Sequence, residues 1–331
     1  MAGWVLGIDG GQSRTVAAVC DLQGRLVGVG RAGPADHVWE PGGRGRARRA
    51  VVDSMARALR AARLGLAAGQ RRVEFEAAFL GITGATEHTR RAVKGCVSTK
   101  RFRLANDKVS ALACVTEGGP GVVVIAGTGT IAYGENGKGE SADASGWGYL
   151  IGDEGGAFWI AKQALAAACR AYDGRGEATA LVEMITAAAG VKNLWGVHAL
   201  IYSGKLSRAK MAGLAVVAAE AAAGGDWAAR AILREAGREL GLAAGVVAKR
   251  LDLHRGKVTV GMVGGVFEGS ALVRQSFARE VRNHAAKATL ARARYAPVMG
   301  SVVLALKMAG CAITAKVRAN LEAGSAAVGA K

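Results

Sequence analysis

The sequence lacks a long uninterrupted hydrophobic run. One of its longest apolar stretches, Met211 to Ala223, is broken by Gly213 and Glu220. It falls short of the roughly 18–20 apolar residues that a membrane-spanning helix needs. The N-terminal residues also lack the charged and apolar segments of a secretory signal, because Val5 to Ile8 runs directly into a glycine turn. We therefore expect a cytoplasmic protein with no membrane partner.

Cysteines and aromatic residues are scarce as well. The cysteines are odd in number, dispersed and never arranged as Cys-x-x-Cys; they are Cys20, Cys96, Cys114, Cys169 and Cys311. Their mostly apolar neighbours favour reduced thiols in the core and provide no evident ligand set for zinc or an iron–sulfur cluster. Aromatic residues make up only 5% of the chain, so alanine and glycine must fill much of the core.

Acidic residues are outnumbered by basic ones, and the formal net charge is +18. A nucleic-acid surface would concentrate basic residues and interleave them with aromatic side chains. Here the basic residues are spread along the chain, and the densest run (Arg44, Arg46, Arg48 and Arg49) contains no aromatic residue. We expect no specific nucleic-acid partner, and a basic surface that attracts phosphorylated ligands.

The 331 residues suit two domains of mixed α/β structure. In the first half, hydrophobic patterning predicts strands at 5–8, 15–20, 25–30, 73–81 and 102–105, and helices at 46–64, 87–97 and from Asp107. After Gly118-Gly119-Pro120 the pattern restarts with strands at 121–125 and 131–134, a helical insertion at 154–251 in which Asp226 caps a helix, and alternating strands and helices at 257–307. The two halves predict related lobes around a cleft, at 1–117 and 118–331. We expect the final helix to pack back on the first lobe and the tail after Arg318 to be loose.

Three glycine-rich turns follow predicted strands: Asp9 to Thr15, Gly127 to Thr130, and Gly264 to Phe267. Glycine lets the backbone approach a polyanion closely, and successive peptide N–H groups in such turns form an anion site. Taken singly, the first and third turns are better explained as ordinary tight turns, and the second fits either explanation. Together, the three turns predict a nucleotide held between two lobes.

In their order along the chain, these turns and two further segments resemble the motifs of the N-acetylglucosamine kinase group within the actin-like and sugar-kinase ATPase superfamily. The motifs are Gly7 to Gly11, Asn106-Asp107, Gly127 to Gly134, Gly146 to Gly155 and Gly264 to Val266. The resemblance extends from Ile8 to about Ala309. It implies an α/β fold of two ribonuclease H-like lobes with a central cleft and a helical insertion in the second lobe. It also implies ATP and Mg²⁺ as cofactors, a small-molecule amino sugar as substrate, and a homodimer.

The resemblance assigns nucleotide contacts to all three turns. Asp9 would orient hydrated Mg²⁺, which keeps several waters in such sites. The other expected contacts are Gly10, Gly11, Gln12, Ser13, Arg14 and Thr15 on one side of the phosphates, Gly127, Thr128, Gly129 and Thr130 on the other, and Gly264, Gly265 and Val266 at the adenosine. Gln12 departs from the family pattern, which commonly has glycine at this position.

The resemblance also implies the catalytic base and the sugar contacts. Asp107 would accept the proton of a sugar hydroxyl during phosphoryl transfer, although an aspartate there could also cap the following helix. Asp153 would accept hydrogen bonds from sugar hydroxyls. The pocket would be completed by Asn106, Thr128, Gly129, Gly146, Trp147 and Gly148; Trp147 could equally be a core residue.

The loop Gly33 to His37 matches a sugar-binding loop, in which Asp36 stands where the family usually has asparagine. We expect Asp36 and His37 to contact the sugar. An ionised aspartate only accepts hydrogen bonds, whereas asparagine also donates them. Asp36 could therefore favour glucosamine, whose ammonium would pair with the carboxylate; otherwise it accepts from ring hydroxyls and N-acetylglucosamine remains the substrate.

Our reading is an ATP-dependent kinase that phosphorylates the C6 hydroxyl of N-acetylglucosamine. A glucosamine kinase or a broad-specificity hexose kinase of the same fold is the first alternative. An activator ATPase of 2-hydroxyacyl-CoA dehydratases or benzoyl-CoA reductases shares the glycine turns, but it would need cysteines for an iron–sulfur cluster. A sugar-responsive regulator would need a DNA-binding module, and the first predicted strand begins by Val5.

Overall fold

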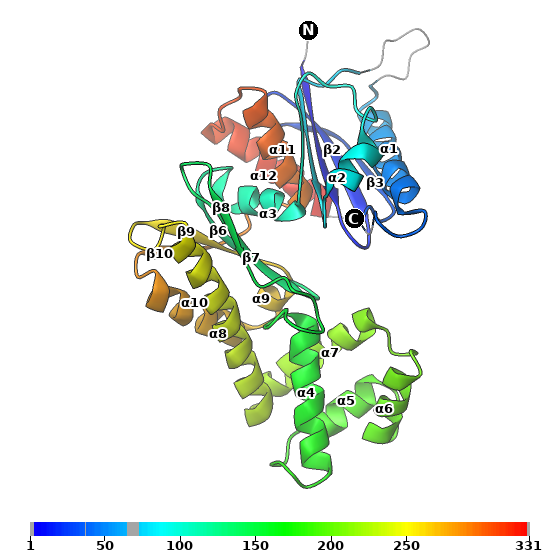
Figure 1. Cartoon of the computed structure of the whole chain (residues 1–331), viewed down its shortest axis with the longest axis vertical. Helices are drawn as coiled ribbons and strands as arrows, with labels where there is room; N and C mark the ends of the chain where they lie inside the picture. The colour runs from blue at the N-terminus through cyan, green and yellow to red at the C-terminus, as the bar shows by residue number, and fades with distance from the viewer. Residues whose placement is uncertain (1–2, 37, 65–72, 330–331) are drawn as a thin grey trace. The chain divides into compact units, whose positions relative to one another are not determined.

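A computed structural model of the chain describes residues 3–36, 38–64 and 73–329, which form two compact units (Figure 1). The first unit comprises residues 1–119 together with 292–331, and the second comprises residues 120–291. Each unit contains a five-stranded sheet. No helix within the described ranges combines the length and the apolar character needed to cross a bilayer.

The first unit is built on a sheet with the strand order β3-β2-β1-β4-β5. Its strands are β1 (Trp4–Gly10), β2 (Thr15–Asp21), β3 (Leu26–Ala32), β4 (Ala77–Ile82) and β5 (Phe102–Ala105). The hairpins β1–β2 and β2–β3 are antiparallel, whereas β1, β4 and β5 run parallel to one another. The carboxyl ends of the three parallel strands therefore lie at one edge of the sheet.

The described residues of the first unit form the helices α1 (Gly43–Ala61), α2 (Glu87–Val93), α3 (Asp107–Thr116), α11 (Pro297–Met308) and α12 (Ala315–Gly329). Helices cover both faces of this sheet, with α1 on one face and α11 on the other (Figure 1). Leu6 and Ile8 share a core with Ala47 and Val51 of α1. On the opposite face a Cβ at Gly7 would lie 2.7 Å from the backbone nitrogen of Val302 in α11. Glycine is thus what allows α11 to pack directly on the central strand.

The second unit repeats this sheet with the order β10-β9-β6-β7-β8. Its strands are β6 (Gly121–Ala126), β7 (Thr130–Glu135), β8 (Ser141–Ala144), β9 (Val258–Val263) and β10 (Ala288–Arg292). The antiparallel strands β6–β7–β8 correspond to β1–β2–β3 of the first unit. The parallel pair β6–β9 corresponds to β1–β4. The duplicated α/β pattern expected from the sequence is therefore present.

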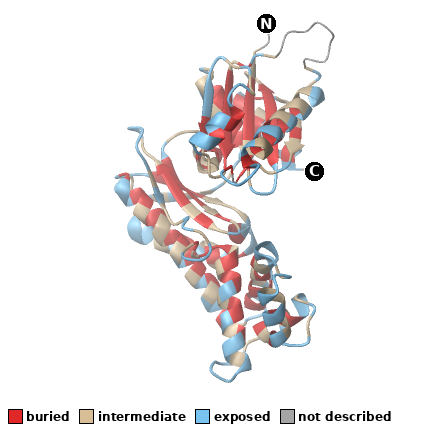
Figure 2. Ribbon diagram, turned by 45° about the vertical axis from the view of Figure 1, so that its right-hand side comes forward, coloured by how far each residue is buried: buried red, intermediate tan, exposed pale blue. Residues whose placement is uncertain are grey.

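Seven helices belong to the second unit: α4 (Ala157–Tyr172), α5 (Leu181–Ala188), α6 (Leu194–Tyr202), α7 (Arg208–Ala223), α8 (Trp227–Arg250), α9 (Gly265–Gly269) and α10 (Ala271–His284). Asp226 caps α8, as predicted, by accepting from the Ala229 N–H at 2.9 Å. Glycines every fourth residue of α8 (Gly237, Gly241 and Gly245) lie where a Cβ would collide with α10. Buried residues are concentrated in the sheet and on the inner faces of these helices (Figure 2).

The two-lobe α/β fold and the helical insertion are confirmed, but the end of the chain differs from its prediction. Residues 292–331 belong to the first unit, where the final helix was expected to pack, although the second lobe was assigned to residue 331. The prediction of a loose tail after Arg318 is wrong, because α12 continues to Gly329. Leu321 is fully buried, and Asn320 donates to the carbonyl of Gln23 at 2.8 Å. These contacts with the β2–β3 hairpin stabilise a helix that the Ala- and Gly-rich sequence does not favour by itself.

The cysteines are free thiols in differing environments. Cys20 and Cys114 are buried, as expected of core residues, and Cys96 and Cys311 are partly buried. Cys169 is exposed on α4, so the expectation of a core position is wrong for it. Its neighbour Ala168 lies on the buried face of the helix, which Cys169 does not share.

Candidate functional site

Two acidic residues and a threonine meet at the carboxyl edge of the first sheet. Asp9 is at the end of β1, where it pairs with Gly81 of β4. Gly81 in turn pairs with Ala105, the last residue of β5, and Asp107 follows two residues later. The Thr83 N–H donates to the Gly10 carbonyl at 2.8 Å, and Thr83 Oγ1 donates to Asp107 Oδ2 at 2.6 Å. The parallel pairing thus brings together residues that are distant in the sequence.

Asn106, rather than Asp107, caps helix α3. Its Oδ1 accepts from the Lys108 N–H at 3.2 Å, and Asp107 is the first residue of the helix. The capping role considered for Asp107 is therefore taken by its neighbour. The Asp107 carboxylate instead accepts the Thr83 hydroxyl on Oδ2, which fixes its orientation.

Burial and mutual repulsion perturb both carboxyl groups. The pKa of Asp9 is raised from 3.8 to about 7, chiefly by burial and also by the negative charge of Asp107, while Arg14 opposes the shift. Burial also raises the pKa of Asp107, while the hydrogen bonds from Thr83 and from the Lys108 N–H act in the opposite direction. Paired carboxyl groups with raised pKa values are typical of sites that bind a cation or accept a proton.

The first glycine turn connects β1 to β2. Gln12, Ser13 and Arg14 are exposed at its tip, where the Gly11 N–H donates to the Arg14 carbonyl at 2.9 Å. Thr15, which was expected to face the phosphates, is buried, and its hydroxyl donates to the Gly33 carbonyl at 2.8 Å. The hydroxyl thus ties the turn to the predicted sugar loop, and the phosphate contact of Thr15 stays a prediction.

The predicted sugar loop, which begins at Gly33, is hydrogen-bonded to this turn. The Ala35 N–H donates to the Gly11 carbonyl at 3.2 Å, and Asp36 is only 4% exposed. Arg46 of α1 donates to the Asp36 carbonyl at 3.1 Å. His37 lies outside the residues that the structure describes. The first unit thus brings Asp36 to the same side of the sheet as the Asp9 turn.

In the second unit, the turn Gly127 to Thr130 is tied to the start of α4. The Ala157 N–H donates to the Gly127 carbonyl at 2.8 Å and the Phe158 N–H donates to the Thr128 carbonyl at 3.1 Å. A Cβ at Gly129 would collide with Asp153 Oδ2, so only glycine fits beside this carboxylate. The structure therefore brings together Gly129 and Asp153, as the resemblance implied.

Asp153 also organises the segment that contains Trp147. Its Oδ1 accepts from the Gly148 N–H at 3.1 Å, and its backbone adopts a left-handed conformation with φ of 58°. Burial raises its pKa, although its backbone hydrogen bonds and Arg208 act against this shift. Gly146 and Gly148 have positive φ values, and Trp147 between them is 75% exposed. Trp147 is therefore not a core residue, which removes that alternative.

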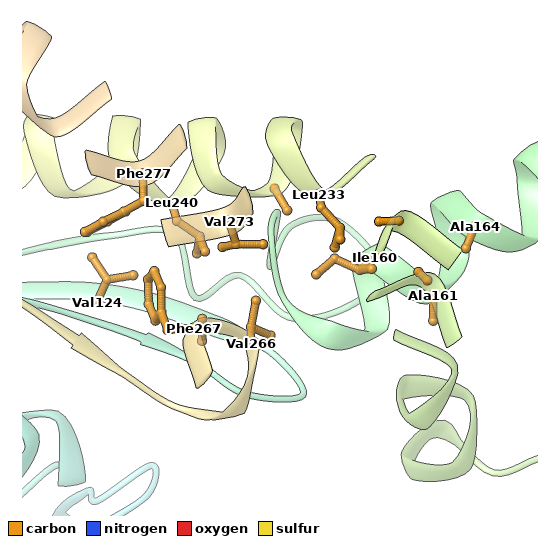
Figure 3. Packing of buried hydrophobic residues seen from close by; sticks show 14 of the residues in the cluster. Val124, Ile160, Ala161, Ala164, Leu233, Leu240, Val266, Phe267, Val273 and Phe277 are labelled. Atoms are coloured by element: carbon orange, nitrogen blue, oxygen red, sulfur yellow. The ribbon is translucent and has the colours of Figure 1, made fainter. Parts of the chain in front are cut away.

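The second unit contains a cavity of about 550 Å³ next to the turn Gly127 to Thr130. Gly127 and Thr128 line one end, and Gly265 and Val266 line another part of its wall. Most of the remaining lining is apolar, including Ile160, Leu233 and Val273, whose side chains Figure 3 shows on neighbouring helices. A volume of this size and an apolar lining with few polar groups are typical of a nucleotide or small-molecule pocket.

Gly264 positions the turn that lines this cavity. Its φ is 106°, and a Cβ there would collide with the carbonyl of Ala126 at the end of β6. Glycine at this position lets α9 begin directly against β6. The turn at Gly264 and the turn Gly127 to Thr130 thus border the same cavity, and both lie within the second unit.

Sequence reasoning missed two parts of these sites. Thr83 was not singled out, because its link to Asp107 depends on the pairing of β4 with β5. The wall that α7 contributes to the cavity was also missed. Its lining residues are small and recur at helical spacing: Ala212, Ala215, Ala219 and Ala223, with Val216 and Glu220. That spacing on an alanine-rich helix was the available signal.

No cluster of three or more His, Cys, Asp or Glu side chains suited to a metal is present in the part of the chain that the structure describes. Mg²⁺ commonly takes most of its ligands from water and phosphate oxygens, so a single carboxylate such as Asp9 would suffice on the protein side. The buried carboxylates of the first unit fit this kind of site, because a cation would relieve the repulsion between Asp9 and Asp107.

Comparisons with known proteins agree with this geometry. The model of the BadF/BadG/BcrA/BcrD ATPase family matches residues 6–305. A Clostridium acetobutylicum protein named N-acetylmuramic acid/N-acetylglucosamine kinase is 29% identical over 307 residues, covering 91% of this chain and 98% of the relative. A Dictyostelium discoideum N-acetyl-D-glucosamine kinase is 27% identical over 311 residues, covering 91% and 97%.

Solved structures support the fold. A candidate N-acetylglucosamine kinase from Chromobacterium violaceum has a TM-score of 0.70 at 24% identity, over 92% of this chain and 99% of that one. A ROK family glucokinase from Streptomyces griseus, solved with glucose and AMPPNP, has a TM-score of 0.56 at 17% identity, over 94% and 99%. The predicted family and the predicted class of enzyme, a sugar kinase, are confirmed.

Proposed function

This chain belongs to the BadF/BadG/BcrA/BcrD ATPase family, and from that premise we propose that it is an ATP-dependent amino-sugar kinase. It transfers the γ-phosphoryl group to the C6 hydroxyl of N-acetylglucosamine, with Asp107 as general base. The observation that carries this proposal is the hydrogen bond of 2.6 Å from Thr83 Oγ1 to Asp107 Oδ2, beside Asp9. A carboxylate held in one orientation is what a hydroxyl nucleophile requires.

In the proposed reaction, the second oxygen of Asp107 accepts the proton of the C6 hydroxyl as the oxygen attacks the γ-phosphorus. The bond from that phosphorus to the bridging oxygen breaks, and ADP leaves. General-base assistance of this kind contributes roughly 10²–10⁴-fold. Bound Mg²⁺ would neutralise charge on the phosphates, with Asp9 holding one of its waters. Most of the remaining acceleration comes from positioning.

The cavity of the second unit supports the nucleotide part of the proposal. Its apolar wall suits a purine, and the N–H groups of the Gly127 to Thr130 turn suit phosphate oxygens. For the sugar, we propose contacts to Asp36, Asp153 and the amide nitrogen of Asn106. We also propose that the enzyme is a homodimer and needs Mg²⁺, because the family resemblance implies both. We propose a cytoplasmic location as well.

The test is coupled ADP release with Mg²⁺ and ATP against N-acetylglucosamine, N-acetylmuramic acid, glucosamine, glucose and mannose. We expect turnover that depends on N-acetylglucosamine and falls about 10²-fold or more in Asp107→Asn. Phosphate on the C6 oxygen is checked by ³¹P–¹H correlation in the product. Binding of ATP without turnover of any of these sugars would contradict the proposal, and so would full activity in Asp107→Asn.

A further inference from the structure

A small cavity of the second unit lies between α8 and α10 and takes no part in the proposed reaction. It measures about 120 Å³ and is lined by Arg234 of α8 and by Leu272, Gln275, Ser276 and Arg279 of α10. Pockets for whole small-molecule ligands usually occupy about 300–1,000 Å³, whereas liquid water takes about 30 Å³ per molecule. The cavity therefore has room for one small polyatomic group, and it is too small to enclose a nucleotide.

The polar side chains of this lining are all hydrogen-bond donors. The guanidinium groups of Arg234 and Arg279 only donate, and the Gln275 amide and the Ser276 hydroxyl can donate as well. No acidic residue is among the described residues that line the cavity. Across the described ranges of the chain, none of these four side chains makes a hydrogen bond or an ion pair with another residue. Their donors are therefore available to a ligand.

Ser276 gives the clearest indication of a ligand. It is only 5% exposed, and a polar group that is buried without a hydrogen-bond partner costs free energy. The two helices approach closely at this point: a Cβ at Gly237 of α8 would lie 2.7 Å from the Cβ of Ser276 and would collide with the carbonyl of Val273. This packing fixes the serine on the wall of the cavity. A ligand oxygen in the cavity would supply the partner that its hydroxyl lacks.

An acidic residue follows each of the two arginines in the sequence, but both acids are paired elsewhere. Glu235 Oε1 is 2.6 Å from Arg238 Nη2, and Glu280 Oε1 is 3.0 Å from His284 Nε2. Both lining arginines are exposed to solvent, so a ligand can enter between them. Two guanidinium groups on different helices suit an anion that accepts several charge-assisted hydrogen bonds at once.

We propose that this cavity binds a phosphate group, with the guanidinium groups of Arg234 and Arg279 and the hydroxyl of Ser276 as donors. A phosphate group is tetrahedral and turns its oxygens toward donors that come from several directions, whereas a carboxylate presents two oxygens in one plane. Its source is either inorganic phosphate or a phosphate monoester whose remaining part stays outside the cavity. This site goes beyond the proposed sugar-kinase function, which uses none of these residues.

The experiment is calorimetric titration of the full chain with inorganic phosphate at about 0.15 M salt, where distant charges are screened. The variants are Arg234→Gln, Arg279→Gln and Ser276→Ala. Arg230→Gln and Arg282→Gln remove the same charge from exposed positions of α8 and α10 outside the lining, and they are the matched controls. We expect each lining arginine variant to weaken binding about tenfold or more, since hydrogen bonds to charged groups are the strong class. Ser276→Ala should weaken binding as well, whereas the controls should bind as the wild type does.

Thermal unfolding provides a second readout on the same proteins. Phosphate should raise Tm for the wild type and the controls but not for the two lining arginine variants, because a ligand of the folded state stabilises it. A phosphate site elsewhere in the protein would not respond to these substitutions. Only the binding that is lost in Arg234→Gln and Arg279→Gln therefore reports this cavity.

The remaining titrations identify the ligand and can overturn the site. If N-acetylglucosamine 6-phosphate binds more tightly than inorganic phosphate and loses affinity in Arg234→Gln, a phosphate monoester is the source; the reverse order identifies free phosphate. Equal losses in the arginine variants and their controls would overturn the site, because they would show only long-range attraction. Unchanged binding in both arginine variants would overturn it too, and so would acetate that binds as tightly as phosphate.

Discussion

Thr83 Oγ1 donates a hydrogen bond of 2.6 Å to Asp107 Oδ2, and this contact connects two parallel strands at the carboxyl edge of the first sheet. It acts against burial, which raises the pKa of the Asp107 carboxyl group. The hydroxyl therefore has two effects on the proposed base. It holds the carboxylate in one orientation, and it stabilises the ionised form that accepts a proton.

Replacing Thr83 by valine should impair catalysis and shift its pH dependence. Valine keeps the shape of threonine but cannot donate, so the pKa of Asp107 should rise and the acidic limb of kcat/KM should move to higher pH. We expect kcat to fall about tenfold or more, the range for a lost hydrogen bond to a charged group. Thr83→Ser keeps the hydroxyl, so the acidic limb of its kcat/KM profile should lie at the same pH as in the wild type. Identical pH profiles in Thr83→Val and the wild type would contradict the role of this contact.

In the protein without bound nucleotide, Asp9 should lower the free energy of unfolding as the pH rises. Its pKa is raised from 3.8 to about 7, chiefly by burial, so the folded state favours the protonated form. Below about pH 4 both folded and unfolded states are protonated, and the penalty is absent; it grows through the window up to about pH 7 and then stays constant. Asp9→Asn should therefore raise Tm at pH 8 but not at pH 4.

Thermal unfolding without nucleotide, measured across this pH range, tests the Asp9 prediction. Asp53→Asn on the exposed face of α1 provides the same chemical change as a control. A Tm difference for Asp9→Asn that is equal at pH 4 and pH 8 would show that burial of the charge is not the cause. The same variant should also lose activity, because the proposed hydrated Mg²⁺ loses its carboxylate.

Gly129 should tolerate no side chain, because a Cβ there would collide with Asp153 Oδ2. Gly129→Ala should displace the carboxylate that accepts the Gly148 N–H, and overpacking of this kind typically costs about 1–3 kcal/mol. We expect KM for the sugar to rise about tenfold or more. Gly137→Ala lies in a turn with open space around the position and should leave both KM and Tm unchanged. An unchanged sugar KM in Gly129→Ala would remove Asp153 from the proposed site.

A larger side chain on the cavity wall formed by α7 should weaken nucleotide binding selectively. Ala219 lines the cavity, and leucine at this position would occupy space that the nucleotide needs. Ala219→Leu should weaken ATP binding about tenfold or more, the range for inserting methylenes into an occupied site, while Tm stays near the wild-type value. Ala209→Leu on the exposed start of the same helix is the control. Equal ATP affinity in both variants would show that the nucleotide binds elsewhere.

The sequence predicted most of the strands, because their apolar runs end in glycine turns that the structure contains. It also predicted the N-cap of α8, since Asp226 is followed by a strong helical pattern. The helix α12 was missed because its stability comes from distant residues: Gly324 lies against Leu26 and Met299. Thr83 was missed for a similar reason, since only strand pairing brings its hydroxyl to Asp107. Local sequence patterns therefore predicted most strands and the N-cap of α8. The helix α12 and the contact of Thr83 depend on residues distant in the sequence, which such patterns do not show.

Asp36 offers a direct test of substrate preference. Its carboxylate is only 4% exposed at a position where the resembled family usually has asparagine. A buried carboxylate should favour a ligand that brings a positive charge, and the ammonium of glucosamine is such a group. We expect Asp36→Asn to lower kcat/KM for glucosamine relative to N-acetylglucosamine by about tenfold or more, as for other hydrogen bonds to charged groups. The ratio of the two kcat/KM values cancels general damage to the fold. If the ratio is the same in both proteins, the charge of Asp36 does not select the sugar, and N-acetylglucosamine remains the substrate that the site best fits.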